Sequence, residues 1–369
     1  MGIPRLAGRA LTLTHGLLVL AVASLVPAAA GGGVKVFDSP DHTLELGLRL
    51  QPRMEYERVV TAGSSDGQRD FLIRRARLKA NGRMLTATYA FEWKIDGTDQ
   101  IGATPTAAVE NAYVQCPLGH DVELRAGLYD QPFSRDRLTS DSRQLAVDRG
   151  EVSNVPDALG LADNVVGFEI LGKANGGHAL YTVGLFDNRL IAGKLQDVPM
   201  VVGRLDLNLG STKDVFQDAH FGSDSWYSVG LNGSFQGSLQ NAAGADDSSN
   251  AAAGIDGMID VPVGVGRLFV KGEMNAIRTE EHGRSDQNNS TVRMLGLGLL
   301  VLNQRLQPFV RFDQVRGDTW ARGGRKDITF VGANLYRRGH NLKLEGDLRF
   351  QAATHDAVDG ARLQAQIDF

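Results

Sequence analysis

The sequence ARLQAQIDF occupies residues 361–369 and alternates strictly between apolar and polar side chains. Its apolar residues would lie on one face of a β-strand and its polar residues on the other. The ends of soluble chains are usually frayed and polar. An amphipathic strand that finishes on Phe369 therefore raises the question of which strand it pairs with.

The same period of two recurs from residue 44 onward. It is clearest in LELGLRLQPRMEYE (44–57), LTATYAFEWKID (85–96) and NLKLEGDLRFQ (341–351), whereas helical spacing is hardly visible. We therefore predict an all-β chain. About sixteen segments carry the pattern, and many have the 9–12 residues that a tilted strand needs to cross a bilayer. Their approximate spans are 44–57, 71–80, 84–95, 106–116, 121–130, 165–172, 179–187, 199–209, 225–236, 253–261, 264–273, 292–302, 306–316, 327–337, 341–352 and 360–369.

Short and long connections alternate between these segments. The short ones are 81–83, 117–120, 173–178, 262–263, 303–305 and 338–340, and the long polar ones are 58–70, 131–164, 237–252, 274–291 and 317–326. This alternation predicts a transmembrane antiparallel β-barrel with tight periplasmic turns and long external loops. The last strand must then pair with the first, because an unpaired backbone group in lipid costs several kcal/mol. The connection at 210–224 is too long for a periplasmic turn, so it indicates either a misplaced strand or an insertion.

The N-terminus has the pattern of a secretory signal peptide. Arg5 and Arg9 precede the apolar run GLLVLAVASLV (16–26), and small residues follow near Ala28–Ala30. We therefore expect a signal peptide over 1–30, a short periplasmic lead-in over 31–43 and one barrel domain over 44–369 in the outer membrane. The formal net charge of −4 gives no basic surface for nucleic acid. The single cysteine leaves no internal disulfide.

Several motifs resemble a known family. They are FLIRRARLKANG (71–82), AFEWKIDG (90–97), AYVQCPLG (112–119), LRAGLYDQPFSRDRLTSDS (124–142) and YTVGLFDNR (181–189). Together they resemble the phosphate-selective porins O and P over roughly residues 43–190. The resemblance implies a sixteen-stranded, trimeric channel in outer-membrane lipid, with arginines lining a path for small anions.

Strand parity selects the residues that would line this path. In the second strand Arg75, Arg77 and Lys79 share a face with Phe71 and Ile73, and the opposite face suits lipid except at Arg74. The predicted substrate pathway consists of Arg49, Arg53, Arg75, Arg77, Lys79, Arg125 and Tyr129. Guanidinium groups at alternate positions would offer an anion successive bidentate partners. The alternative is that these arginines neutralise carboxylates in the lumen and only stiffen the wall.

The connection 131–164 would be the third external loop. In general porins this loop folds into the lumen, so we predict a constriction loop, with an external lid as the alternative. It carries Arg135, Arg137, Arg143 and Arg149 together with six acidic residues, a net charge of −2. Phosphate-selective members depend on a lysine cluster, yet this chain has no lysine between Lys94 and Lys173. Phosphate uptake and weakly selective diffusion of polar solutes both remain open.

Other functions have less support in the sequence. A plugged structural or adhesion barrel would use its long loops for binding. An outer-membrane hydrolase would need a serine and a histidine facing each other on the outer wall, and the predicted strands offer no such pair. A soluble exported sandwich is a further alternative. The eight histidines are scattered without zinc-binding spacing. We therefore expect no enzyme activity, metal or cofactor.

Overall fold

The chain folds into a β-barrel. A computed structural model describes residues 33–61, 64–96, 106–187, 195–196, 199–240, 246–281, 287–317, 325–352 and 359–369, so the predicted signal peptide lies outside the described residues. The strands are β1 (Val34–Asp38), β2 (His42–Thr61), β3 (Ser64–Met84), β4 (Ala87–Asp96), β5 (Thr106–Gly119), β6 (Val122–Asp130), β7 (Asn164–Ala174), β8 (Ala179–Asp187), β9 (Leu195–Gln196), β10 (Met200–Gly210), β11 (Trp226–Gln240), β12 (Asp246–Val263), β13 (Gly266–Glu281), β14 (Gln287–Leu300), β15 (Leu306–Gly317), β16 (Lys326–Tyr336), β17 (Leu342–Ala352) and β18 (Asp359–Asp368). Among the described helices, none is long and apolar enough to span a membrane.

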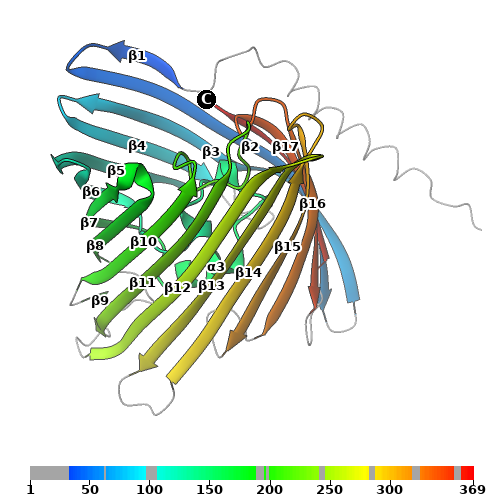
Figure 1. The fold of residues 1–369 in the computed structure, drawn as a ribbon. Coiled ribbons are helices and arrows are strands. Elements are labelled where there is room, and N and C mark those ends of the chain that lie inside the picture. Colours follow the sequence, from blue (N-terminus) through cyan, green and yellow to red (C-terminus); the bar gives the residue numbers. More distant parts are fainter. Residues whose placement is uncertain are drawn as a thin grey trace, which may run out of the picture.

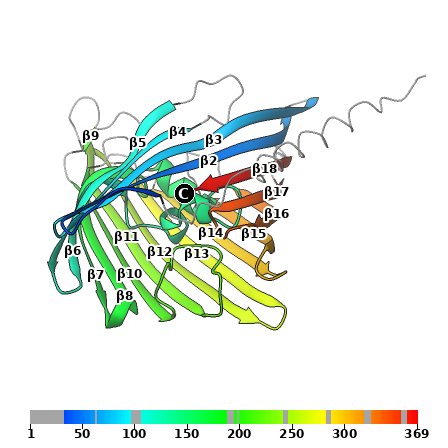
Figure 2. The same ribbon diagram turned by 90° about the horizontal axis from the view of Figure 1, so that it is seen from above.

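Sixteen of these strands form a closed antiparallel ring (Figures 1 and 2). β8 pairs with β10, and β18 pairs with β2 to complete the circle. The other two strands are additions, because β1 folds back on the start of β2 and the two-residue β9 pairs with the end of β11. The predicted fold class is confirmed, and each of the sixteen predicted segments overlaps one strand of the ring.

The last residue of the chain belongs to the closing seam. The backbone N–H of Phe369 donates to the Leu48 carbonyl oxygen at 3.0 Å, and the Leu48 N–H donates to the Phe369 carbonyl oxygen at 2.7 Å. Asp368 faces Arg49 across the same pair of strands. The terminal strand therefore pairs with the first strand of the ring, as the closure of a membrane barrel requires.

Side chains alternate across the wall as the period of two predicts. Along β10 the residues with even numbers from Met200 to Asn208 are buried, whereas Val201, Leu205 and Leu207 are exposed. The exposed set presents an apolar outer face and the buried set points into the lumen.

The second strand contains one departure from simple parity. Gln51 of β2 faces Arg75, but the next residue, Pro52, faces Ile73, so Arg74 is the extra residue of a β-bulge. The bulge shifts the alternation by one residue. Phe71 and Ile73 consequently point outward, with exposed fractions of 60% and 52%. The prediction that Phe71 and Ile73 share the lumenal face with Arg75, Arg77 and Lys79 is therefore wrong, although those three cations do face inward.

The connection between β10 and β11 is an insertion and not a misplaced strand. β10 ends at Gly210, β11 begins at Trp226, and these two residues pair directly. Residues 211–225 leave this hairpin end and turn into the barrel, where Ala219 and His220 are almost fully buried. We call this segment the inner turn. The other described connections on the same side of the barrel are short turns, such as Leu85–Thr86 and Gly264–Val265.

Candidate functional site

The long loop 131–163 lies inside the barrel. It contains α2 (Arg135–Leu138), a 3₁₀ turn (Asp141–Arg143) and α3 (Glu151–Ala158), and α3 is seen within the ring of strands in Figure 1. Phe133, Val152 and Val155 are fully buried and pack with Ile277 and Met294 from the lumenal faces of β13 and β14. The loop's apolar residues therefore pack on apolar inward side chains of this half of the wall, which also carries buried polar and charged residues. We call this segment the inner loop.

Arg135 fastens the inner loop to the wall. Its Nε lies 2.6 Å from a carboxylate oxygen of Asp256 and its Nη2 lies 3.0 Å from one of Asp206. The same guanidinium donates to the Ser228 hydroxyl and to the Val215 carbonyl oxygen. With only 1% of its side chain exposed, Arg135 serves as an anchor and has no surface left for a solute.

Arg137 holds the two ends of the inner loop together. Its guanidinium contacts the carboxylates of Asp130, Asp157 and Asp163 at 2.6, 3.1 and 3.3 Å. Burial raises the pKa of Asp157 to about 6, because the nearby Asp163 charge adds to the effect of burial and Arg137 offsets only part of it. Asp157 therefore titrates close to neutral pH.

The barrel should become slightly more heat-resistant as the pH falls from 7 to 5. A carboxyl group whose pKa is higher in the folded protein than in the unfolded chain takes up protons on folding, so its contribution to stability grows below its folded pKa. Because Asp157 is about one-third exposed, screening limits the gain to about 1 kcal/mol or less. Thermal unfolding at the two pH values would measure it. An Asp157→Asn barrel should show a smaller pH dependence than the wild type, and an equal dependence in both proteins would contradict the assignment.

The inner turn meets the inner loop from the opposite end of the lumen. Its Asp218 N–H donates to the Arg143 carbonyl oxygen at 2.9 Å, and the Leu145 N–H donates to the Asp218 carboxylate at 2.9 Å. Lys271 of β13 joins the two segments, because its Nζ lies 2.9 Å from Asp136 of the loop and 2.7 Å from Asp218 of the turn. We call this Asp136–Lys271–Asp218 cluster the clasp. All three of its side chains are almost fully buried.

The opposite half of the lumen is lined by cations from β2, β3 and β18. Arg53 binds both carboxylate oxygens of Asp148 at 2.7 and 2.8 Å. Arg75 lies 3.0 Å from Asp141, and Arg77 lies 3.1 Å from Glu110 and 3.3 Å from Asp141. Two carboxylates of the inner loop thus reach across and dock on this arginine wall.

The same wall continues toward the turn side of the barrel. Arg49 lies 2.9 Å from Asp368 and donates to the Ser140 hydroxyl at 3.0 Å. Lys79 lies 2.5 Å from the other oxygen of Asp368. Asp368 therefore has two cationic partners.

Three cavities open along this polar half. The largest, about 480 Å³, lies at the turn side between Arg49, Lys79, Asp368 and Arg143 of the inner loop. One of about 140 Å³ lies toward the long loops and is lined by Arg53, Asp148, Arg349 and Arg362. Gln51 and Arg75, hydrogen-bonded to each other at 3.2 Å, lie between the β2 residues that line these two cavities.

The third cavity, of about 220 Å³, contains Arg125 and Tyr129. The Arg125 guanidinium lies 3.0 Å from Glu169, and its central carbon is 5.2 Å from the centre of the Tyr129 ring. Tyr129 itself is only 2% exposed and belongs to the apolar cluster around the inner loop. Of the two, Arg125 is the side chain that a solute in this cavity could reach.

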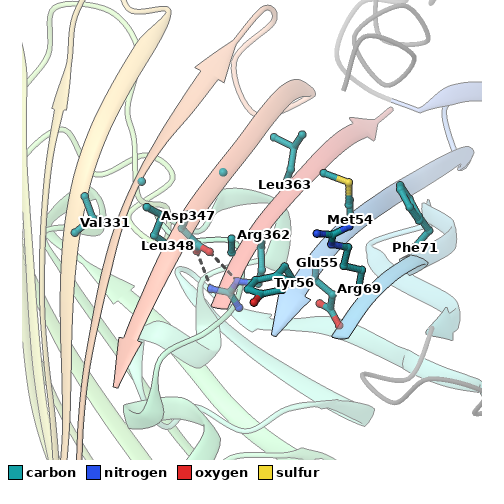
Figure 3. A pocket seen from close by; sticks show the side chains of 13 residues that line it. Met54, Glu55, Tyr56, Arg69, Phe71, Val331, Asp347, Leu348, Arg362 and Leu363 are labelled. Carbon is teal, nitrogen blue, oxygen red and sulfur yellow. Dashed lines mark hydrogen bonds and ion pairs between the residues drawn. The ribbon is translucent and has the colours of Figure 1, made fainter. Parts of the chain in front are cut away.

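A still larger hollow, of about 840 Å³, lies on the outer wall. It crosses the closing seam, and its apolar lining includes Met54, Phe71, Leu348 and Leu363 (Figure 3). These residues belong to the outward-facing set of the alternation. The hollow therefore belongs to the surface that faces hydrocarbon and not to the lumen.

The structure places the predicted residues in three settings. Four of them line lumenal cavities: Arg49, Arg53, Lys79 and Arg125. Two more, Arg75 and Arg77, are buried between the cavities and the inner loop. Each of these six side chains has a carboxylate partner. Of the loop arginines, Arg143 lines the cavity on the turn side. Arg135 and Arg137 are anchors, and Arg149 lies 2.7 Å from Asp141 within the loop.

Sequence reasoning missed two cations of the wall. Arg362 of β18 lies 2.8 Å from Asp148 and 2.7 Å from Asp347, as the dashed lines to Asp347 in Figure 3 show in part. Its inward parity was readable from residues 361–369. Arg74 lies 3.5 Å from Asp148 because the bulge turns it inward, and no signal in the residue pattern indicated that bulge.

Comparisons with known proteins agree with this geometry. Residues 46–199 match the family described as phosphate-selective porin O and P. This match covers less than half of the chain, and over that part the chain is similar to phosphate-selective porins. Over the matched residues the predicted resemblance is confirmed. No curated protein sequence matches the chain.

Solved porin-like structures share the fold at low sequence identity. The anion-selective porin of Comamonas acidovorans is 14% identical with a TM-score of 0.60, over 89% of this chain and all of that one. The outer-membrane protein OmpT of Vibrio cholerae, solved in a trimer form, is 8% identical with a TM-score of 0.56, over 89% and 100%. The channel DcaP of Acinetobacter baumannii is 12% identical with a TM-score of 0.55, over 91% and 100%.

Proposed function

We propose that this chain is an outer-membrane porin that passes small anions, phosphate among them, by passive diffusion along the wall formed by β2, β3 and β18. The observation that carries the proposal is the row of cations between the two cavities on that wall. Arg53 and Arg362 line the cavity toward the long loops, and Arg49 and Lys79 line the larger one on the turn side. An anion moving between them would meet a guanidinium or ammonium group at each step.

The filling of the opposite half of the lumen supports this route. The inner loop and the inner turn bury their apolar residues against β10–β16. The carboxylates of Asp136 and Asp218 are held in the clasp by Lys271. Charges engaged in this way are less available to attract cations. The partly exposed cations near the cavities, Lys79, Arg125 and Arg362, then contribute most to the field that a permeating ion meets.

The reversal potential across a KCl gradient in a planar bilayer tests this proposal. We expect chloride to permeate more readily than potassium, and an Arg49→Gln channel should lose up to about fivefold of this preference, the effect of about 1 kcal/mol. Arg49 suits the test because its partner Asp368 would keep Lys79. An unselective or cation-selective wild-type channel would overturn the proposal.

A matched control separates a local effect from a change in net charge. Arg278 lies on the outer face of β13, with about half of its side chain exposed, and pairs with Glu280. Arg278→Gln removes the same charge as Arg49→Gln but leaves the lumen untouched. Its reversal potential should equal that of the wild type. Block of the current by added phosphate would show that phosphate enters the same path.

A plugged barrel is the second candidate. It is favoured by the meeting of the inner loop and the inner turn, which are in contact through Arg143, Leu145 and Asp218. In such a protein the long external connections would serve as a binding surface. The absence of any conductance from correctly folded barrels would support this candidate against the channel.

We also propose that the mature protein is a homotrimer in outer-membrane lipid and that residues 1–30 are removed on export. The trimer form of the Vibrio cholerae protein supports the first part. Chemical crosslinking in native membranes would test the trimer. Mass spectrometry of the mature N-terminus would test the cleavage.

A further inference from the structure

The carboxylate of Asp148 occupies a cluster of four guanidinium groups. Its Oδ1 accepts from Arg53 Nη2 at 2.7 Å and lies 3.5 Å from both Arg75 Nη2 and Arg74 Nε. Its Oδ2 accepts from Arg53 Nη1 and from Arg362 Nη1, each at 2.8 Å. The contact with Arg53 is bidentate, the geometry that matches a planar carboxylate.

This carboxylate comes from the inner loop, whereas the four arginines belong to the wall. The loop brings it there through its own backbone: the Val147 N–H donates to Asp347 at 3.2 Å, and the Asp148 carbonyl oxygen accepts from Arg311 at 2.7 Å. The wall therefore forms a carboxylate-binding site whose occupant is supplied by another part of the same chain.

The site is open to solvent on one side. Asp148 keeps 22% of its side chain exposed, and the exposed part faces the cavity of about 140 Å³ toward the long loops. By contrast, Asp141, the other loop carboxylate on this wall, is only 5% exposed. A solute that reaches the cavity could approach Arg362, whose side chain is 12% exposed, without first unfolding the loop. Arg53 is only 1% exposed and becomes accessible when Asp148 is displaced.

Asp148 stays ionised in this setting. Burial by itself would raise the pKa of its carboxyl group, but Arg53, Arg74 and Arg362 outweigh that effect and hold the pKa well below its usual range. It is therefore a permanent anion at neutral pH. Any other anion that binds the cluster must compete with it.

We propose that Asp148 is a tethered competitor of the permeating solute, and that Arg53, Arg75 and Arg362 bind small carboxylate anions when it is displaced. The inference rests on the proposed anion pathway and specifies the chemistry of its solutes. A competitor of this kind lets an anion bind briefly and leave again, which conduction requires. It also lowers the apparent affinity, because the site is free for only a fraction of the time.

The proposal is tested by block of chloride current with added acetate in a planar bilayer. Wild-type channels should be blocked weakly. Asp148→Asn vacates the site while keeping the size of the side chain, so the half-blocking concentration of acetate should fall about tenfold. Asp148→Glu keeps the tethered charge and should remain close to the wild type. Inorganic phosphate is measured in parallel, and a larger change for acetate than for phosphate is expected because the four arginines are arranged around a planar carboxylate.

Asp163→Asn is the matched control, because it removes one negative charge from the same loop at a residue that pairs with Arg137 and lines none of the three lumenal cavities. It should leave the block within about twofold of the wild type. An equal fall for both asparagine variants would reduce the effect to net charge and overturn the proposal. An unchanged block in Asp148→Asn, or a larger change for phosphate than for acetate, would overturn it as well.

Two further measurements keep the outcomes separate. The heat-dependent gel mobility of each variant reports whether its barrel has formed, and Asp148→Ser replaces Asp148→Asn if the latter does not fold. The reversal potential of the wild type tests the anion pathway itself. A wild-type channel without anion preference would overturn the proposed function. If the wild type prefers anions but Asp148→Asn leaves the acetate block unchanged, only the proposal that Asp148 competes with the solute is overturned.

Discussion

A Lys271→Met barrel should open its inner loop far more readily than the wild type does. The substitution removes the cation between Asp136 and Asp218, whose carboxylates are 0% and 2% exposed. Leaving buried carboxylates without a cationic partner costs about 3–5 kcal/mol. Hydrogen exchange at the Leu145 and Asp218 amides should therefore accelerate by about a hundredfold or more, since local opening sets their protection.

Two variants identify the clasp as the cause. Adding Asp136→Asn and Asp218→Asn to Lys271→Met replaces the unpaired charges with amides and should restore most of the protection. Lys173→Met, at an exposed pair with Asp121 on a turn, should change nothing measurable. Equal exchange rates in the single and triple variants would show that the clasp does not hold the loop.

The architecture of the ring could be predicted because membrane barrels obey a strict local rule. Each spanning strand must show apolar side chains to lipid and polar ones to the lumen, so the alternation is visible in the residues themselves. The segment 361–369 illustrates this: its alternation puts Arg362 and Leu363 on opposite faces, and in the structure Arg362 points inward and Leu363 outward, although Arg362 was not selected as a site residue. The parity of β3 failed only before Arg74, at Phe71 and Ile73, because a bulge is decided by the pairing of two strands and leaves little trace in either one.

The interior was less accessible to sequence reasoning. Arg135 and Arg149 read as equivalent loop arginines, yet one is anchored by Asp206 and Asp256 and the other pairs with Asp141. These partners are distant along the chain, and their distances depend on how the loop folds within the ring. The position of the loop along the chain therefore predicted a constriction loop, but its charges could not separate the anchors from residues that a solute can reach.

The inner turn was recognisable in the sequence only as an anomaly of length. Its buried residues, such as Val215 and Ala219, do not belong to a periodic pattern that would predict their burial. His220 could be seen as a single histidine, but its stacking on Trp226 at 4.0 Å and its contact with Asp260 depend on the turn entering the lumen. The one usable signal was that this connection is too long for a periplasmic turn.

Replacing the inner turn with a two-residue hairpin should enlarge the pore. Gly210 and Trp226 already face each other at the ends of β10 and β11, so Asn-Gly can join them without disturbing the strands. The lumen would lose the side chains of 211–225, and the inner loop would lose its contacts with Asp218. We expect the single-channel conductance to rise at least about twofold, with a weaker ion preference, because a wider pore screens the wall charges more completely.

Asp218→Asn distinguishes the effect of removing the side chains of the inner turn from the effect of weakening the clasp. It leaves the turn in place but weakens its contact with Lys271, so its mean conductance should stay near the wild-type value while brief fluctuations increase. If the hairpin variant and Asp218→Asn both conduct like the wild type, the inner turn does not limit the pore. Ions would then pass only along the wall of β2, β3 and β18, where Arg49 and Arg53 would set the conductance without help from the opposite half of the lumen.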